Sequence, residues 1–256
     1  MKPMQLTSPN IRAIQRALTI CTYDPGPIDG ILGRRTEGAW KEWMEEETDL
    51  QPLVIEGIAG PKLNAMAQKL QSAMAQRLKV LSATYTGPNT LLKHIHTFAP
   101  LFNLPTHGHM AYLMATAEWE TARTFLPVRE GYWKFGGKPQ EDTTTSAFQR
   151  REAWRQDTMR YYPYYGRGLV QLTWLRNYEY YAELFLIDVE TMRERALNPG
   201  YALFVMMHGM SMGVFGRTVN RYIRPGKYDF VGARRSVNGT DKAEKIAKLA
   251  RKWLRK

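Results

Sequence analysis

HMAYLMATAEWETARTFLPVREGYW, residues 109–133, begins with a helical pattern that carries an acid inside its apolar face. At 100° per residue, Met110, Leu113, Met114, Ala117 and Thr121 form one stripe. Glu120 lies about 20° from Leu113, within that stripe, whereas Glu118 lies about 140° away. Because burial disfavours the ionised form of a carboxyl, we predict a raised pKa for Glu120, as a general acid at neutral pH requires. Glu118 is predicted to be a solvated or structural side chain.

A second carboxyl, Glu130, follows ten residues after Glu120, in a stretch broken by Pro127. Two carboxyls in different environments are the minimum equipment for hydrolysing a glycosidic bond. One stays protonated and donates to the leaving oxygen, while the other stays ionised and activates water or attacks. The spacing alone does not distinguish this pair from two surface charges, so the assignment depends on the rest of the chain.

The supporting segment is YYPYYGRGLVQLTWLRNYEYY, residues 161–181. Alternation predicts a strand over Leu169–Trp174, with Gln171 and Thr173 on the same face as Leu169. Two short polar side chains on one face could position a water or a sugar hydroxyl. The clustered tyrosines could stack on sugar rings or could simply pack within a hairpin.

Towards the N-terminus, Ile11, Ile14 and Leu18 have helical spacing, and a dense turn signal follows at residues 23–27. A second helical pattern contains Trp40 and Trp43. The phrase I-[acid]-G-I-x-G-x-[base] occurs at residues 28–35 and again at 55–62, where Pro61 suits the first turn of a third helix running to about Leu70. These features predict three helices joined by two turn-rich connections.

Residues 166–178, GRGLVQLTWLRNY, together with Trp119-Glu120-Thr121, resemble the family 19 glycoside hydrolases, which are chitinases and phage or bacterial muramidases with a lysozyme-like fold. Residues 234–239, RRSVNG, resemble that family's R-x-I-N-G phrase. The resemblance implies that Glu120 is the general acid, that Glu130 is the general base and that Thr173 holds the attacking water. The implied substrate-binding residues are Gln171, Asn177 and Asn238, to which we add Tyr165 and Arg167.

The phrase YDPGPIDGILGRRTEGAW, residues 23–40, resembles the peptidoglycan-binding module of many cell-wall hydrolases. Asp29, Gly30, Gly33 and Thr36 match its motif. The alternative is a small helical adaptor whose glycines only make turns. We therefore expect a mainly α protein with a small three-helix peptidoglycan-binding domain (1–72), a linker (73–90) and a larger lysozyme-like α+β domain with a small β-hairpin (91–256).

The charge is unevenly distributed: residues 1–70 carry net −1 and residues 71–256 carry net +13, which together give +12. A basic surface attracts polyanions, and peptidoglycan is the expected partner rather than nucleic acid. The last segment, DKAEKIAKLARKWLRK (241–256), holds seven basic residues beside an apolar stripe. It is either an ordinary last helix with a solvated basic face or a contact for anionic membrane or lipopolysaccharide.

The sequence also bears on metal sites, cofactors and membrane segments. The histidines show no H-E-x-x-H spacing and the chain has no phosphate-binding glycine loop, so we expect no metal and no cofactor. His208 is expected to be a core histidine. The chain begins with no apolar signal segment, and its longest apolar run (201–216) is interrupted by polar residues and is shorter than the roughly 18 residues of a membrane span.

The resulting expectation is a monomeric endolysin, made in the host bacterial cytoplasm and reaching the wall in the periplasm through a holin-type lesion. It would be a muramidase that hydrolyses the β-1,4 bond between N-acetylmuramic acid and N-acetylglucosamine with inversion. Two alternatives remain: a chitinase of the same fold, and a cationic binder of wall or membrane without catalysis.

Overall fold

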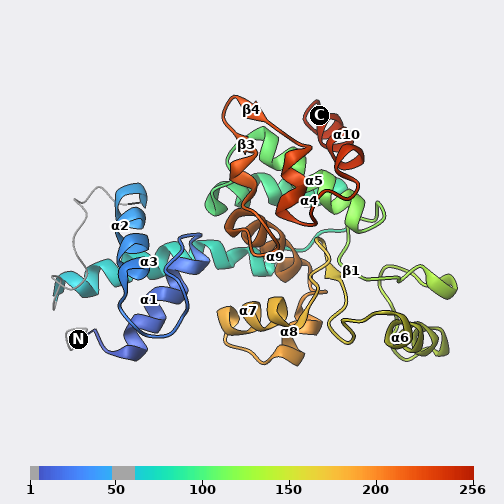
Figure 1. The fold of residues 1–256 in the computed structure, drawn as a ribbon, viewed down its shortest axis with the longest axis horizontal. Coiled ribbons are helices and arrows are strands. Elements are labelled where there is room, and N and C mark those ends of the chain that lie inside the picture. The colour runs from blue at the N-terminus through green and yellow to red at the C-terminus, as the bar shows by residue number, and fades with distance from the viewer. Residues whose placement is uncertain (1–5, 48–60) are drawn as a thin grey trace. The chain divides into compact units, whose positions relative to one another are not determined.

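The computed structural model describes residues 6–47 and 61–256, and the chain divides into two compact units, Met1–Lys79 and Val80–Lys256 (Figure 1). Its described residues hold ten α-helices and two antiparallel sheets of two strands each. The prediction of a mainly α fold with little strand is confirmed. Where the sequence placed a linker at 73–90, residues 73–78 continue a helix of the first unit and residues 88–90 begin a helix of the second.

The first unit contains three helices: α1 (Ser8–Ile20), α2 (Arg34–Glu47) and α3 (Pro61–Leu78). Their apolar faces enclose a core around the touching indoles of Trp40 and Trp43, whose ring centroids are 5.2 Å apart. The third helix extends beyond Leu70 because Ala73 and Met74 also pack against this core. Most of the repeated phrase at residues 55–62 lies outside the described residues.

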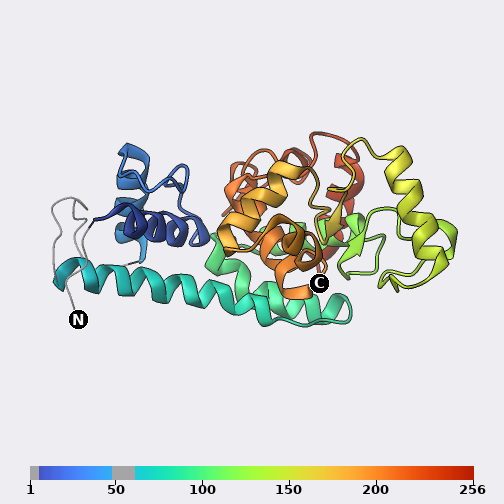
Figure 2. The same ribbon diagram turned by 90° about the horizontal axis from the view of Figure 1, so that it is seen from below.

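The second unit follows in the order η2 (Lys79–Ser82), α4 (Pro88–Phe98), η3 (Ala99–Phe102), α5 (His107–Glu120), β1 (Val128–Arg129), η4 (Lys134–Gly136), α6 (Ser146–Thr158), β2 (Arg167–Gly168), α7 (Leu175–Phe185), α8 (Val189–Arg195), α9 (Pro199–Met212), η5 (Val219–Arg221), β3 (Ile223–Arg224), β4 (Lys227–Tyr228), η6 (Gly232–Ser236) and α10 (Ala243–Trp253). In the sheets, Val128 pairs with Gly168 and Ile223 pairs with Tyr228. Figure 2 shows α7 and α8 side by side on this unit.

Two helices of the second unit, α5 and α9, are buried on nearly all sides. A helix that is apolar all round is typical of a core position. Thr106 caps α5, since its hydroxyl accepts from the backbone N–H of His109. In α9, the ring of His208 stacks on Phe204 with centroids 5.1 Å apart. The expected core role of His208 is confirmed.

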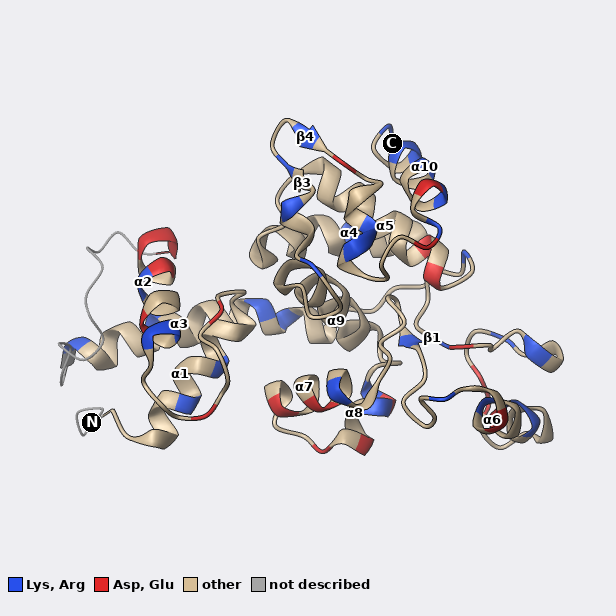
Figure 3. Cartoon of the chain, in the orientation of Figure 1, with Lys and Arg blue, Asp and Glu red and all other residues tan. Residues whose placement is uncertain are grey.

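The last helix, α10, lies against α5 with Ile246, Ala250 and Trp253 buried. The lysines and arginines of this helix are exposed, and Figure 3 marks their positions along α10 in blue. The indole N–H of Trp253 donates to Oε2 of Glu118 at 2.7 Å, so of the two roles predicted for Glu118, solvated or structural, the structure shows the structural one. Among the described residues no helix has both the length and the apolar character to cross a membrane.

The strand predicted at Leu169–Trp174 is wrong. Two backbone hydrogen bonds join Arg167 and Leu172, at 3.1 and 2.8 Å, so the chain reverses inside the predicted strand. Gln171 takes a positive φ of 55° in that turn. Leu169 is buried, whereas Gln171 and Thr173 reach a cavity, so alternation did not decide which side chains share a face.

Candidate active site

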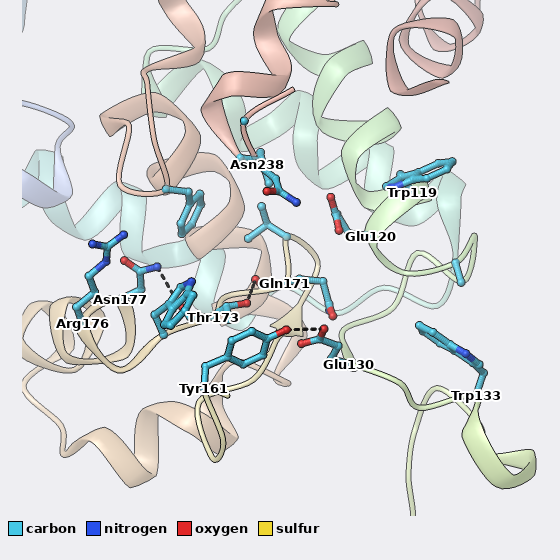
Figure 4. A pocket seen from close by; sticks show the side chains of 16 residues that line it. Trp119, Glu120, Glu130, Trp133, Tyr161, Gln171, Thr173, Arg176, Asn177 and Asn238 are labelled. Carbon is cyan, nitrogen blue, oxygen red and sulfur yellow. Dashed lines mark hydrogen bonds between the residues drawn. The ribbon is translucent and has the colours of Figure 1, made fainter. Parts of the chain in front are cut away.

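A cavity of about 640 Å³ in the second unit brings together side chains from six segments (Figure 4). The C-terminus of α5 forms one wall, and the segment after β1 forms another. The turn after β2 with the start of α7 and the loop after η6 form further walls, and Tyr161 after α6 and Phe215 after α9 complete the lining. Of the predicted site residues, the structure brings six to this cavity: Glu120, Glu130, Gln171, Thr173, Asn177 and Asn238.

Glu120 is the last residue of α5, and its side chain is 15% exposed. Burial raises the pKa of this carboxyl, and the negative charge of Glu130 adds to the rise. The guanidinium of Arg234, which donates to Oε1 at 2.6 Å, opposes it. The effect of burial is the largest, so the pKa stays raised, as the helical pattern predicted.

Arg234 was not identified from the sequence. It lies in η6 with its guanidinium buried, and its Nε donates to the carbonyl of Asp241 at 2.9 Å. The phrase RRSVNG begins with Arg234, but from this phrase we assigned only Asn238 to the site. A buried arginine needs a carboxylate or carbonyl partner, so an arginine next to a motif residue marks a second group of the same site.

Glu130 follows β1 and is held at both main chain and side chain. Its N–H donates to the carbonyl of Gly166 at 2.8 Å, and its Oε2 accepts from the N–H of Gly166 at 2.9 Å. Its Oε1 accepts from the hydroxyl of Tyr161 at 3.0 Å. Burial and the nearby Glu130 charge raise the pKa of Tyr161 to about 12, so the phenol remains a donor at neutral pH. The carboxylate is therefore fixed in one orientation.

The polar side chains near Glu130 are tied to the backbone. The hydroxyl of Thr173 donates to the carbonyl of Gln171 at 2.8 Å, which leaves the Thr173 oxygen as an acceptor towards the cavity. The amide nitrogen of Gln171 donates to the carbonyls of Val128 and Gly168 at 3.3 and 3.2 Å. The amide nitrogen of Asn177 donates to the carbonyl of Thr173 at 2.7 Å. These bonds pre-orient the wall opposite Glu120.

The structure does not bring Tyr165 and Arg167 to the cavity. Both are buried, and the guanidinium of Arg167 lies 3.8 Å from the ring centroid of Tyr165. Arg167 donates to the carbonyls of Pro163 and Tyr165, and the Tyr165 hydroxyl donates to Glu152 at 2.7 Å. Their predicted role in substrate binding is replaced by a structural one: they hold the turn that carries Gln171.

Two exposed indoles that the sequence analysis missed line the same cavity. Trp133 is 56% exposed and Trp174 is 39% exposed. Trp174 is braced by Tyr161, with ring centroids 5.1 Å apart, and by the guanidinium of Arg160 at 4.9 Å. Large aromatic faces left open beside polar groups are typical of a ligand-binding cleft.

In the first unit, the motif residues meet at one side chain, the buried Gln15. Its amide nitrogen donates to Oδ1 of Asp29 at 2.9 Å and to the hydroxyl oxygen of Thr36 at 3.1 Å. Its Oε1 accepts from the N–H of Gly30 at 2.9 Å. Gly30 has a φ of 77°, and a Cβ there would lie 2.3 Å from Oγ of Ser8. Three of the four motif residues therefore build the loop.

Gly33, the fourth motif residue, immediately precedes α2, and its carbonyl accepts from the N–H of Glu37 at 3.0 Å.

Across residues 6–47 and 61–256, no group of three or more His, Cys, Asp or Glu is placed to hold a metal ion. Compared with known proteins, the chain matches no protein-family model, no curated protein and no solved structure. Function therefore has to be inferred from the geometry of the cavity.

Proposed function

We propose that the second unit is a glycoside hydrolase that cleaves the β-1,4 bond between N-acetylmuramic acid and N-acetylglucosamine in bacterial peptidoglycan. The observation that carries the proposal is one cavity lined by two carboxyls in different environments, Glu120 buried beside Arg234 and Glu130 held by Tyr161 and Gly166. Acid–base cleavage of a glycosidic bond needs two carboxyls in different environments, one to donate a proton and one to accept a proton.

Glu120 is the general acid in this proposal. Burial raises its pKa and so favours the protonated form, and the proton passes to the glycosidic oxygen as the bond to the leaving sugar breaks. The resulting Glu120 carboxylate is then stabilised by the Arg234 guanidinium. Arg234 thus acts through Glu120 as a positioning residue.

Glu130 is the general base. A water that donates one hydrogen bond to Glu130 and one to the Thr173 oxygen attacks the anomeric carbon from the face opposite the leaving group, and Glu130 takes its proton. An inverting enzyme of this kind needs about 6.5–9.5 Å between the two carboxyls to admit that water. Gln171, Asn177 and Asn238 hold sugar substituents, and the two indoles stack on sugar faces.

The first unit and the charge distribution support peptidoglycan as the substrate. The loop built on Gln15 carries the motif that resembles a peptidoglycan-binding module, and a second binding module raises the local concentration of the enzyme on the wall. The net charge of +13 over residues 71–256 draws that part of the chain to an anionic polymer. We accordingly propose an endolysin that reaches the wall after a holin-type lesion.

The deciding experiment compares the wild type with Glu120→Gln and Glu130→Gln on purified sacculi, with mass spectrometry of the released fragments. Glutamine has the size of glutamate and keeps one acceptor oxygen, so we expect both variants to fold. Their melting temperatures check this. We expect roughly 10²–10⁴-fold loss of rate in either variant. We also expect new reducing ends on muramic acid in the wild-type digest.

Other products would redirect the assignment. Reducing ends on glucosamine contradict the proposed bond, and anhydro ends contradict water attack. Sugar released from chitin but not from sacculi indicates the chitinase alternative. If Glu120→Gln kills intact cells as well as the wild type does and sacculi stay intact, the cationic binder is the correct alternative.

A further inference from the structure

A second cavity, of about 780 Å³, lies between the C-terminus of α5 and the outward side of α10. We call it the α10 groove. Its lining includes Trp119 and Ala122, which also line the active cavity. Trp119 directly precedes Glu120 in the chain and is labelled beside it in Figure 4. The groove therefore continues from the proposed catalytic cleft and belongs to the same unit.

The groove is strongly cationic. Five basic side chains line it, all of them exposed and none in a salt bridge within the described residues: Arg123, Lys245, Lys248, Lys252 and Arg255. Its one carboxylate, Glu118, already accepts the Trp253 N–H. Like charges one turn apart on a helix repel each other, and an anionic ligand removes that cost.

The floor of the groove is apolar. Trp119, Ala122 and Leu249 lie between the cations, and Nζ of Lys245 lies 5.9 Å from the centroid of the Trp119 ring. A matching ligand carries several anionic groups on a backbone with small aliphatic parts. A peptide with carboxylate side chains has this character, and peptidoglycan bears such peptides on its muramic acid residues.

We propose that the α10 groove binds the carboxylate-bearing peptide branches of the glycan strand that occupies the active cavity. This inference rests on the proposed function. A membrane surface is the competing source of negative charge, but α10 is poorly suited to it. A helix that lies in a bilayer interface inserts its apolar face, whereas Ile246, Ala250 and Trp253 are buried against α5.

The test uses the full chain with Lys248→Gln plus Lys252→Gln. The matched control is Lys93→Gln plus Lys227→Gln, which removes the same charge from exposed positions that line none of the cavities described above. Two soluble substrates are compared: glycan strands bearing peptides, and strands from which an amidase has removed them. The peptide-free strands keep only the carboxylate of muramic acid.

We expect the groove variant to raise KM for peptide-bearing strands roughly tenfold with kcat unchanged, since two exposed charge contacts with the ligand are lost. KM for peptide-free strands should change much less, and the control should behave as the wild type. An equal change on both substrates, or the same change in the control, would overturn the proposal because net charge would then explain it.

Binding without cleavage separates this inference from the proposed function. Titration calorimetry with an N-acetylated tetrapeptide of alanine, glutamate, diaminopimelate and alanine should show weakened binding by the groove variant and unchanged binding by Glu120→Gln. This result supports the groove even if no glycan is cleaved. No tetrapeptide binding by the wild type overturns the groove proposal even if glycan is cleaved. If the groove variant loses binding to phosphatidylglycerol vesicles while its glycan kinetics stay unchanged, the groove binds lipid. That result also overturns the groove proposal.

Discussion

Replacing Gly166 with alanine tests the position of the proposed base with a single methyl group. An alanine Cβ at this position would lie 3.1 Å from Oε2 of Glu130 and 2.7 Å from Oε1 of Gln171. Atoms in good contact lie about 3.5–4.0 Å apart, so both side chains must move. Gly166 has no positive φ, and alanine keeps the N–H that binds Glu130, so the methyl is the only perturbation.

The two neighbours yield to different extents. Gln171 is held by two long hydrogen bonds, at 3.3 and 3.2 Å, and swings away. Glu130 is fixed through Tyr161 and its own N–H and moves by a few tenths of an ångström. Because misplacement by about 1 Å costs about 10²-fold, we expect a roughly tenfold lower kcat. Overpacking costs about 1–3 kcal/mol of unfolding free energy, which is a fall in melting temperature of about 2–12 °C.

The assay measures the initial rate on sacculi well below the melting temperature of the variant. Gly87→Ala serves as the control, because a Cβ at Gly87 meets nothing within 4 Å. A wild-type rate in a folded Gly166→Ala variant would refute the argument that the Glu130 carboxylate must sit where Gly166 places it.

Three further predictions follow from contacts in both units. Arg234→Gln removes the cation that lowers the pKa of Glu120, so this pKa rises further and the alkaline limb of the kcat/KM profile should move to higher pH. A calorimetric melt should show a loss of about 1–3 kcal/mol, because Glu120 loses a buried hydrogen-bond donor. Thr173→Val keeps the shape but loses the acceptor for water, and we expect kcat to fall roughly tenfold with little change in KM. Gln15→Leu leaves the Asp29 loop without its donor and should destabilise the first unit by about 1–3 kcal/mol in hydrogen exchange, while turnover of soluble strands is retained.

Local periodicity was sufficient to predict much of the helical framework. The spacing of apolar residues placed Glu120 in a buried face and predicted its raised pKa, because both depend on neighbours within two turns of one helix. The same logic identified the apolar stripe of α10 but left open whether the protein or a membrane covers it; in the structure α5 covers it. These features require no knowledge of distant parts of the chain.

The rest of the site depends on contacts that periodicity does not encode. Arg234 meets Glu120 from 114 positions away, and Tyr161 meets Glu130 from 31 positions away. The predicted strand at 169–174 failed because a tight reversal can carry an alternating pattern. Arg167 lies inside the specific motif and yet is buried, since a conspicuous residue can serve the turn rather than the ligand.

The bond between Trp253 and Glu118 joins positions 135 residues apart. The ribosome synthesises α5 long before α10. Until Trp253 has been added, the Glu118 carboxyl lacks its indole donor and the face of α5 that α10 covers is exposed to solvent. The helix that ends in Glu120 is therefore secured only after α10 has been made. For a glycoside hydrolase of the kind proposed, we therefore expect chains that stop before α10 to be inactive.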